Sequence, residues 1–343
     1  MRKMNTGHAT AADHMTLVSP SLYDVTAAVN EAEAPRISVI VPTYNRREML
    51  RDTLDALFTQ DFAGSFEVIV VDDASRDGTE LMLAEAARRA TCGFKAVRLR
   101  QNHGAPFARN AGLALARGEF IAFTDSDCVP SPGWLRACDD ALANGFDVVQ
   151  GRTVPPPWER KPLFSHYIQT AEADGLFTTA NAAYRRRVVM GVGGFNPECD
   201  YWEDVDLGWR SVRAGARYGF APEALVFHQV IVQRPQTWIR HVWHFTRWPI
   251  IAAHYPEFRR HLFLRVWVDS FHALVTLAAA GIVLSRFRRR FALMALPYLA
   301  AFPFRHGLRG RWPLLKAAAH LGRDWVAFSA LLWGSIRYKS PVL

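Results

Sequence analysis

Between residues 37 and 123, short runs of apolar, β-branched residues alternate with segments of helical periodicity. Runs such as 37–41 and 67–71 have the composition of strands buried on both faces. The other expected elements are helices at 47–60, 80–90 and 106–116 and strands at 96–99 and 120–123. This alternation predicts an α/β sheet with helices on both faces. Ligands of such sheets bind beyond the carboxyl ends of the strands, where Asp73, Asp125 and Asp127 are expected.

The pattern changes after Gly151, and the chain ends in a stretch rich in tryptophan, arginine and apolar residues. The elements expected there are a strand at 181–184, a helix at 201–214 and a strand at 226–228. The expected organisation is a loosely ordered leader over residues 1–35, an α/β domain over 36–232 and a helical region over 233–343. No apolar run follows Arg2 and Lys3, so the leader does not look like a secretory signal, and we expect the chemistry to face the cytoplasm.

The 343-residue chain carries a formal charge of +9, and many of its basic residues lie after residue 230. Aromatic and aliphatic residues separate basic clusters such as 286–290, which favours an anionic membrane surface over nucleic acid as a partner. The four cysteines form no CxxC pair and no metal-like spacing with histidine. We therefore expect the reduced thiols of a cytosolic protein.

Asp125 and Asp127, one residue apart after an apolar run, are the strongest indication of chemistry. Two carboxylates at the end of a buried strand need compensating partners, and a hard divalent cation that also binds a diphosphate supplies one. The alternative is a surface turn with two solvated aspartates. Asp73 is expected on the same edge, where it can accept a hydrogen bond from a pyrimidine base while Tyr44 stacks on the ring. Its alternative is a turn or helix cap.

Glu203 and Asp204 begin a predicted helix, where acids commonly cap the N-terminus and complement the dipole. The functional interpretation is that one of them is the general base for an acceptor hydroxyl, because two acids in one turn raise each other's pKa. His228 ends an apolar run, so it is by default a core histidine. It becomes a metal ligand if its strand reaches the edge that carries Asp127.

Five segments follow one another in a characteristic order: ISVIVPTYNR at 37–46, VVDDASRDGT at 70–79, NHGAPFARNAG at 102–112, FTDSDCVP at 123–130 and EDVDLGWR at 203–210. Together they resemble glycosyltransferase family 2 over roughly residues 36 to 230, about the size of one domain. The resemblance implies a GT-A fold, which is a Rossmann-like α/β sheet. It also implies an inverting single displacement on a nucleotide-sugar.

The resemblance also implies roles for individual residues. Pro42, Thr43 and Tyr44 border the base, Asp73 hydrogen-bonds it, and Arg109 lies near the nucleotide. Asp125 touches the ribose and the metal, Asp127 binds Mn²⁺ or Mg²⁺, and His228 lies on the metal or the diphosphate. Asp204 is then the catalytic base, with Glu203 beside it as a substrate-binding residue.

Two positions depart from the family pattern. Cys128 stands where many members carry a further acid after the DxD triplet, so the metal has one carboxylate fewer. Processive members carry QxxRW, whereas this chain has His244 in place of the glutamine, before Arg247 and Trp248. The second departure favours a single transfer over polymer synthesis.

Residues 266–284 have the apolar character of a spanning helix, but the uninterrupted run, 273–284, falls short of the roughly 20 residues that a bilayer needs. Residues 291–304 are shorter and contain two prolines. A crossing from the cytoplasm would also place the basic cluster 286–290 outside, against the positive-inside rule. We therefore expect helices that lie on the cytoplasmic membrane face; the alternatives are an inserted two-helix hairpin and a soluble helical cap.

The sequence thus predicts a metal-dependent, inverting glycosyltransferase that builds a lipid-linked or cell-envelope glycan at the cytoplasmic face of the membrane. Its expected partners are a nucleotide-sugar donor, a glycan or lipid-linked acceptor and the membrane surface, but not nucleic acid. A processive polysaccharide synthase is the alternative within catalysis. A non-catalytic nucleotide- or glycan-binding scaffold is the alternative from another class.

Overall fold

The computed structural model describes residues 19–30, 34–199, 201–308 and 313–343, and these divide into two compact units. Unit 1 holds the described residues up to 160 together with 167–230, and unit 2 holds 161–166 together with 231–343. The division after residue 230 lies close to the boundary expected at 232. Segment 161–166, expected within the α/β domain, instead belongs to unit 2.

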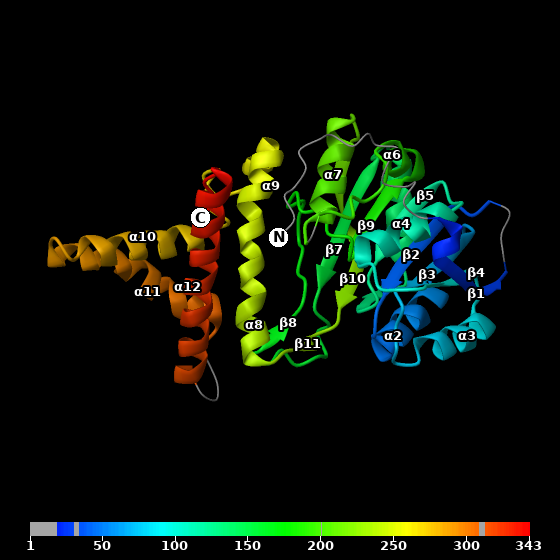
Figure 1. The fold of residues 1–343 in the computed structure, drawn as a ribbon, viewed down its shortest axis with the longest axis horizontal. Helices are drawn as coiled ribbons and strands as arrows, with labels where there is room; N and C mark the ends of the chain where they lie inside the picture. Colours follow the sequence, from blue (N-terminus) through cyan, green and yellow to red (C-terminus); the bar gives the residue numbers. More distant parts are fainter. Residues whose placement is uncertain (1–18, 31–33, 200, 309–312) are drawn as a thin grey trace. The chain divides into compact units, whose positions relative to one another are not determined.

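Unit 1 is built on one mixed sheet (Figure 1). Its strands are β1 (Tyr23–Val29), β2 (Ile37–Thr43), β3 (Phe66–Asp72), β4 (Gly93–Leu99), β5 (Phe120–Thr124), β6 (Cys128–Pro130), β7 (Val148–Val154), β9 (Asn181–Arg185) and β10 (Tyr218–His228). Among the described residues, nine strands are ordered β1-β4-β3-β2-β5-β9-β7-β10-β6. Strands β4, β3, β2 and β5 run parallel, as the strand–helix alternation predicts.

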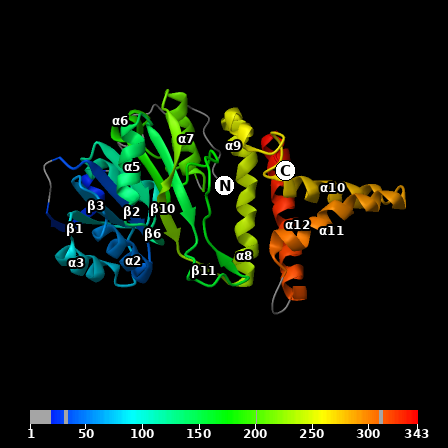
Figure 2. The ribbon, with the colours of Figure 1, turned by 180° about the vertical axis from the view of Figure 1, so that it is seen from behind.

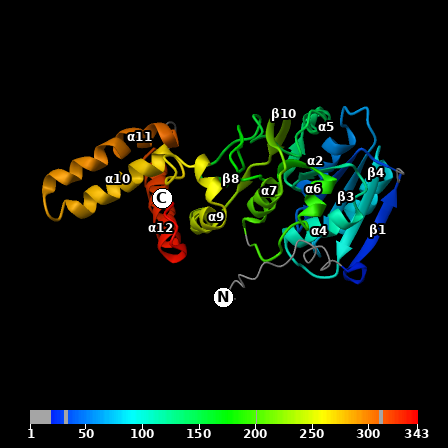
Figure 3. The ribbon, with the colours of Figure 1, turned by 90° about the horizontal axis from the view of Figure 1, so that it is seen from above.

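Helices cover both faces of this sheet, so the predicted α/β architecture is confirmed. They are η1 (Pro20–Leu22), α2 (Arg47–Phe58), α3 (Thr79–Arg89), α4 (Ala105–Leu115), α5 (Trp134–Ala143), α6 (Arg186–Gly191) and α7 (Glu203–Arg213). Figure 3 shows α2 and α5 on one side and α4, α6 and α7 on the other. Helix α5 packs on β10 and β7 (Figure 2). Helix α4 approaches β2 so closely that a Cβ on Gly112 would meet the Ile40 side chain at 2.5 Å.

The central strands are buried because they lie between these helices. Every residue of β2 and all but the first of β3 are buried, which matches their nearly continuous apolar runs. Strands β2 and β3 pair in parallel register from Ile37 opposite Phe66 to Thr43 opposite Asp72. Their carboxyl ends therefore lie side by side, and β5 ends on the same edge at Thr124.

Strand β10 carries His228 to the edge that follows β5. Its pairing with β7 is interrupted between Ala221 and Leu225, around Pro222, which has no N–H to give to a ladder. Beyond the interruption β10 pairs antiparallel with β6, and His228 lies opposite Cys128. A residue separated from Asp127 by a long stretch of sequence thus comes next to it in space.

The expectation of a loosely ordered leader was wrong for residues 23–29. These residues form β1, which pairs antiparallel with β4 from Tyr23 opposite Leu99 to Val29 opposite Phe94. An edge strand whose residues are all exposed or half-buried has a weaker apolar pattern than a central strand, so composition does not reveal it. Residues 1–18 and 31–33 of the predicted leader lie outside the described part of the chain.

Unit 2 is mainly helical. Its elements are β8 (Ser165–His166), β11 (Ile231–Val232), α8 (Pro235–His241), η2 (Val242–Arg247), α9 (Trp248–His254), η3 (Pro256–His261), α10 (Ser270–Leu284), η4 (Arg289–Ala295), α11 (Leu296–His306) and α12 (Pro313–Tyr338). Helices α10 and α11 lie side by side (Figure 3). Phe271 and Val275 of α10 and Tyr298 of α11 belong to a small hydrophobic core between them. Within the described ranges, no helix has both the length and the apolar character needed to cross a membrane.

Candidate functional site

A cavity of about 310 Å³ opens in unit 1 where β2, β3 and β5 end. Six of the residues predicted to surround the nucleotide line it: Pro42, Thr43, Tyr44, Asp73, Arg109 and Asp125. Arg46 and Ser126 are further polar residues of its wall, and Ala105 and Ala108 contribute from α4. Side chains from four separate segments of the sequence thus meet in one cavity.

Asp73 fixes the loop that leads into α4. Its Oδ1 accepts the backbone N–H of His103 at 2.8 Å, while its Oδ2 accepts the N–H of Gly104 at 2.8 Å and the Asn102 side-chain amide at 2.9 Å. Burial raises the pKa of the Asp73 carboxyl above its ordinary value, although the two backbone N–H groups oppose this. A carboxylate has about four lone-pair positions, so Oδ1 can accept another hydrogen bond from the cavity.

Thr43 and Tyr44 complete this end of the cavity in different ways. The Thr43 side chain is buried, and its Oγ1 has no hydrogen-bond partner among the described residues. A buried hydroxyl without a partner is costly, so a ligand atom there would satisfy it. Tyr44 is 46% exposed, which leaves an aromatic surface available at the cavity wall.

Arg109 connects the cavity to the acidic start of α7. Its guanidinium is nearly fully buried and contacts Asp125 at 2.8 Å, Glu203 at 3.1 Å and Asp204 at 3.7 Å. Burial opposes the charge of Arg109, but these three carboxylates outweigh it and raise the arginine pKa above its ordinary value. One cation therefore holds together three of the predicted site residues.

Glu203 and Asp204 begin α7, as the sequence predicts. Both oxygens of Asp204 are held by Thr179, through its backbone N–H at 3.0 Å and its hydroxyl at 2.9 Å. Burial raises the pKa of Asp204 in spite of Arg109 and Thr179. Burial and the neighbouring Asp204 charge raise the pKa of Glu203 from 4.5 to about 7. The environment of both acids thus raises the pKa and favours their protonated forms.

Asp127, Cys128 and His228 form a second, adjacent cluster. Asp127 Oδ2 lies 3.8 Å from His228 Nε2, and one potential ligand atom from each of the three residues lies within 4.8 Å of the others. His228 Nδ1 is hydrogen-bonded to the backbone oxygen of Gln229 at 2.8 Å, which turns Nε2 toward Asp127. Two ligands at about 2.1 Å from one ion can lie up to about 4.2 Å apart, so the aspartate and histidine fit a shared cation.

The structure does not bring Asp125 into this cluster of potential metal ligands. Asp125 pairs with Arg109, whereas Asp127 pairs with Arg46, whose Nη1 lies 2.5 Å from Asp127 Oδ2. Sequence reasoning did not identify Arg46 or Thr179 as site residues. The position of Arg46, two residues after Tyr44 in the segment that follows β2, is a usable signal. For Thr179 the sequence contains no such signal, because only the fold brings this residue to Asp204.

Comparisons with known proteins show which family and which fold the chain is similar to. The family model described as "Glycosyl transferase family 2" matches residues 38–196, and the one described as "Glycosyl transferase family group 2" matches residues 120–305. A solved structure of the mannosyltransferase PcManGT from Pyrobaculum calidifontis, in complex with GDP-Man and Mn²⁺, is similar with a TM-score of 0.54. The similarity covers 94% of this chain and 91% of that protein at 23% identity, which shows a common fold.

Relatives in sequence are more similar over shorter stretches. Glycosyltransferase AglE of Haloferax volcanii is 32% identical over 208 residues, which are 57% of this chain and 67% of that protein. The poly(ribitol-phosphate) beta-N-acetylglucosaminyltransferase TarS of Staphylococcus aureus is 45% identical over 161 residues, 42% of this chain and 28% of that protein. The chain spans less than half the length of several curated relatives that it matches.

The family models together span residues 38–305, and the second of them matches more than half of the chain. This range includes the cavity residues, Arg109, and the cluster around Asp127. On the basis of these matches, the chain belongs to glycosyltransferase family 2.

Proposed function

We propose that the protein is an inverting, metal-dependent glycosyltransferase that moves one sugar from a nucleotide-diphosphate sugar to an acceptor hydroxyl. The observation that carries this proposal is the contact of one buried guanidinium, Arg109, with Asp125 at the cavity and with Glu203 and Asp204 at the start of α7. A transfer reaction needs a donor site and a proton acceptor close to each other. The Arg109 network couples the two.

The cavity at the ends of β2 and β3 is proposed to bind the nucleotide end of the donor. Thr43 offers a buried hydroxyl that has no partner within the described part of the chain, Asp73 can accept an N–H from the base, and Tyr44 offers its ring for stacking. Pro42 borders the base, and Asp125 and Arg109 lie toward the ribose and diphosphate. The complex of PcManGT with GDP-Man supports a nucleotide-sugar as the ligand class.

Asp127 and His228 are the residues that would hold Mn²⁺ or Mg²⁺. Their 3.8 Å separation fits one cation, and the Asp127 carboxylate is a ligand that suits both Mn²⁺ and Mg²⁺. The cation supplies compensation for the negative charge on the departing diphosphate. The Mn²⁺ in the PcManGT complex supports this choice.

Asp204 is proposed as the catalytic base. Thr179 fixes its carboxylate by two hydrogen bonds, and its raised pKa favours acceptance of a proton. The acceptor oxygen attacks the anomeric carbon and gives its proton to Asp204. The bond from that carbon to the diphosphate breaks, and its electron pair leaves with the diphosphate. Attack opposite the leaving group inverts the anomeric centre.

A lipid-linked or cell-envelope glycan is the proposed acceptor class. The name of TarS, which acts on poly(ribitol-phosphate), supports a cell-envelope role by similarity. A single transfer is favoured over processive synthesis because His244 stands in place of the glutamine of QxxRW. A non-catalytic scaffold would keep the cavity but would have no use for the buried acidic pair at Glu203 and Asp204.

Unit 2 is proposed to bind the cytoplasmic membrane surface. Large apolar side chains are exposed on its helices and on the turn that follows α10: Phe287, Leu293, Leu296, Leu299, Phe304, Leu314, Leu315, Trp333 and Ile336. The exposed arginines Arg286, Arg288, Arg289 and Arg290 flank Phe287. Apolar side chains interleaved with arginines are the chemistry of a surface that binds anionic lipid headgroups.

The enzymatic proposal is tested by incubating the purified chain with UDP-, GDP- and dTDP-sugars and Mn²⁺. Thermal shift identifies the bound donor, and release of the nucleoside diphosphate measures slow donor hydrolysis. We expect both signals for one donor class. Binding without hydrolysis or transfer to any glycan or lipid-phosphate acceptor would favour the scaffold. Stabilisation by no donor would refute the proposal.

A further inference from the structure

Arg46 is the one cationic side chain among the described residues that contacts the buried carboxylate of Asp127 directly. The Arg46 side chain is 42% exposed, whereas that of Asp127 is 4% exposed. A buried carboxylate needs a compensating charge or hydrogen bonds, and Arg46 supplies both to Oδ2. His228 Nε2 faces the same oxygen from 3.8 Å. Arg46 thus occupies the carboxylate oxygen that a cation shared with His228 would use.

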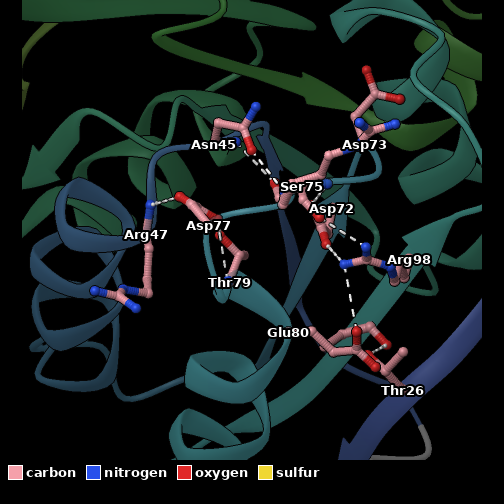
Figure 4. Close-up of polar contacts among 12 residues, drawn as sticks. Thr26, Asn45, Arg47, Asp72, Asp73, Ser75, Asp77, Thr79, Glu80 and Arg98 are labelled. Atoms are coloured by element: carbon pink, nitrogen blue, oxygen red, sulfur yellow. Dashed lines mark hydrogen bonds and ion pairs between the residues drawn. The ribbon is translucent and has the colours of Figure 1, made fainter.

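The backbone on both sides of Arg46 is braced against the loop that follows β3 (Figure 4). Asn45 donates its N–H to Ser75 Oγ at 2.8 Å, and its side-chain oxygen accepts the N–H of Arg76 at 2.8 Å. Arg47 donates its N–H to Asp77 Oδ2 at 2.9 Å. The Arg46 main chain is therefore fixed, so that any movement of the guanidinium must come from its long side chain.

The neighbouring residues Asp72 and Asp73 have different roles at this loop. Figure 4 shows Asp72 directed toward Ser75 and Arg98, while the Asp73 carboxylate points away from them. Asp72 accepts the Ser75 N–H at 2.9 Å and pairs with Arg98 at 2.7 Å. The hydrogen bond to Asp72 fixes Ser75, and Ser75 in turn accepts the N–H of Asn45. The brace that fixes Arg46 is thus built by residues that do not line the cavity, whereas Asp73 does.

A divalent cation and the Arg46 guanidinium cannot both lie against Asp127 Oδ2 without strong repulsion, because two positively charged groups within about 4 Å of each other repel strongly at a partly buried site. A cation on Asp127 and His228 therefore displaces Arg46. Arg46 also lines the 310 Å³ cavity, so the displaced guanidinium stays next to the position assigned to the donor. Arginine is well suited to bind phosphate oxygens there.

We propose that Arg46 competes with the divalent cation for Asp127 and, once displaced, binds the diphosphate of the donor. This inference rests on the proposed function, since it assumes a nucleotide-diphosphate donor. Arg46 is then a positioning residue that couples the two binding events. The cation binds weakly without nucleotide because it must displace Arg46, and the nucleotide diphosphate gives the released guanidinium a new partner. Each ligand strengthens binding of the other.

The test compares Arg46→Gln with Arg47→Gln. Arg47 is the matched control: it is the next residue, its side chain is 44% exposed, and it pairs with Glu48 rather than with Asp127. Free Mn²⁺ is measured by electron paramagnetic resonance without nucleotide. The affinities for UDP, GDP and dTDP are measured by calorimetry with Mn²⁺. Thermal unfolding shows that each variant is folded.

We expect Arg46→Gln to bind Mn²⁺ alone about three- to tenfold more tightly than wild type, and to bind the nucleotide about tenfold more weakly. Arg47→Gln should change neither affinity. Arg46→Lys, which keeps the charge, should restore Mn²⁺ affinity toward the wild-type value and only part of the nucleotide affinity.

Unchanged or weaker Mn²⁺ binding by Arg46→Gln would overturn the competition, and unchanged nucleotide affinity would overturn the second role of Arg46. The proposed function fails separately, if the wild-type chain binds none of UDP, GDP and dTDP in the presence of Mn²⁺. Nucleotide binding by wild type with no specific effect at Arg46 would leave the proposed function intact and remove only this inference.

Discussion

Thr179 donates both its backbone N–H and its hydroxyl to the carboxylate of Asp204, at 3.0 and 2.9 Å. The two hydrogen bonds hold the carboxylate plane, while Arg109 approaches it from 3.7 Å. Glu203, its neighbour on α7, has no such clamp and instead accepts a hydrogen bond from Arg109 at 3.1 Å. The two adjacent acids are therefore held in different ways, and their variants should behave differently.

Asp204→Asn should lower the rate of transfer by about 10²- to 10⁴-fold, the usual contribution of a general base, because the amide cannot take the acceptor proton. Donor affinity should stay close to that of wild type, since Asp204 does not line the nucleotide cavity. Single-turnover rates and donor affinities measure the two effects. Glu203→Gln is the matched comparison. A large loss of rate there, with activity kept in Asp204→Asn, would reassign the base to Glu203.

The raised pKa of Glu203 predicts a pH dependence of stability. This carboxyl titrates near 4.5 when the chain is unfolded and near 7 in the folded protein, so between these values the folded state binds more protons. The free energy of unfolding should then fall as the pH rises from about 4.5 to 7 and level off above. The contribution of Glu203 is on the order of 3 kcal/mol.

Urea unfolding at pH 5 and pH 8, without divalent cations, checks this dependence. Glu203→Gln, which cannot ionise, should show a smaller loss of stability between the two pH values than wild type. Equal losses in the two proteins would show that Glu203 titrates near its ordinary value when folded.

Asp127 should be required for any effect of a metal on donor binding. In wild type, EDTA should abolish transfer and weaken donor binding, and Mn²⁺ should restore both. Asp127→Ala should be inactive and should bind the donor with an affinity that Mn²⁺ does not change, because His228 would be left without its carboxylate partner. Wild-type activity that is indifferent to EDTA would contradict the metal assignment.

The sequence was sufficient to predict the central strands and the edge where they end. Strands β2, β3 and β5 have continuous apolar runs because helices cover both faces, and the acids after them cannot belong to that core. Asp73 and Asp125 could be placed at one edge from this pattern, and both line the cavity. Strand β1 could not be predicted in this way, since an edge strand with exposed residues has no continuous apolar run.

Contacts that depend on the rotation of single side chains were beyond sequence reasoning. Their spacing places Asp125 and Asp127 close together in the sequence. In the structure, however, Asp125 pairs with Arg109 and Asp127 pairs with Arg46. The approach of His228 depends on the interruption of β10 around Pro222 and on its pairing with β6. Such long-range pairing leaves no local signal, whereas buried strands and helix starts do.

Membrane binding by unit 2 should need both its arginines and its exposed apolar side chains. Sedimentation with vesicles of phosphatidylglycerol should bring down the protein, while phosphatidylcholine vesicles should not, and added salt should weaken the interaction. Each arginine near an anionic surface contributes about 1 kcal/mol, so replacing Arg288, Arg289 and Arg290 with glutamine should weaken binding about 100-fold. Phe287→Ser should weaken it by up to about tenfold.

Leu81→Ser is the control for the apolar variant, because Leu81 is 79% exposed on α3 of unit 1, close to the 80% exposure of Phe287. It should leave vesicle binding unchanged. Carbonate extraction separates the two modes of attachment: helices on the surface should release the protein, and an inserted hairpin should retain it. Equal binding to both lipids, or no effect of the arginine and Phe287 variants, would show that this surface of unit 2 has another partner.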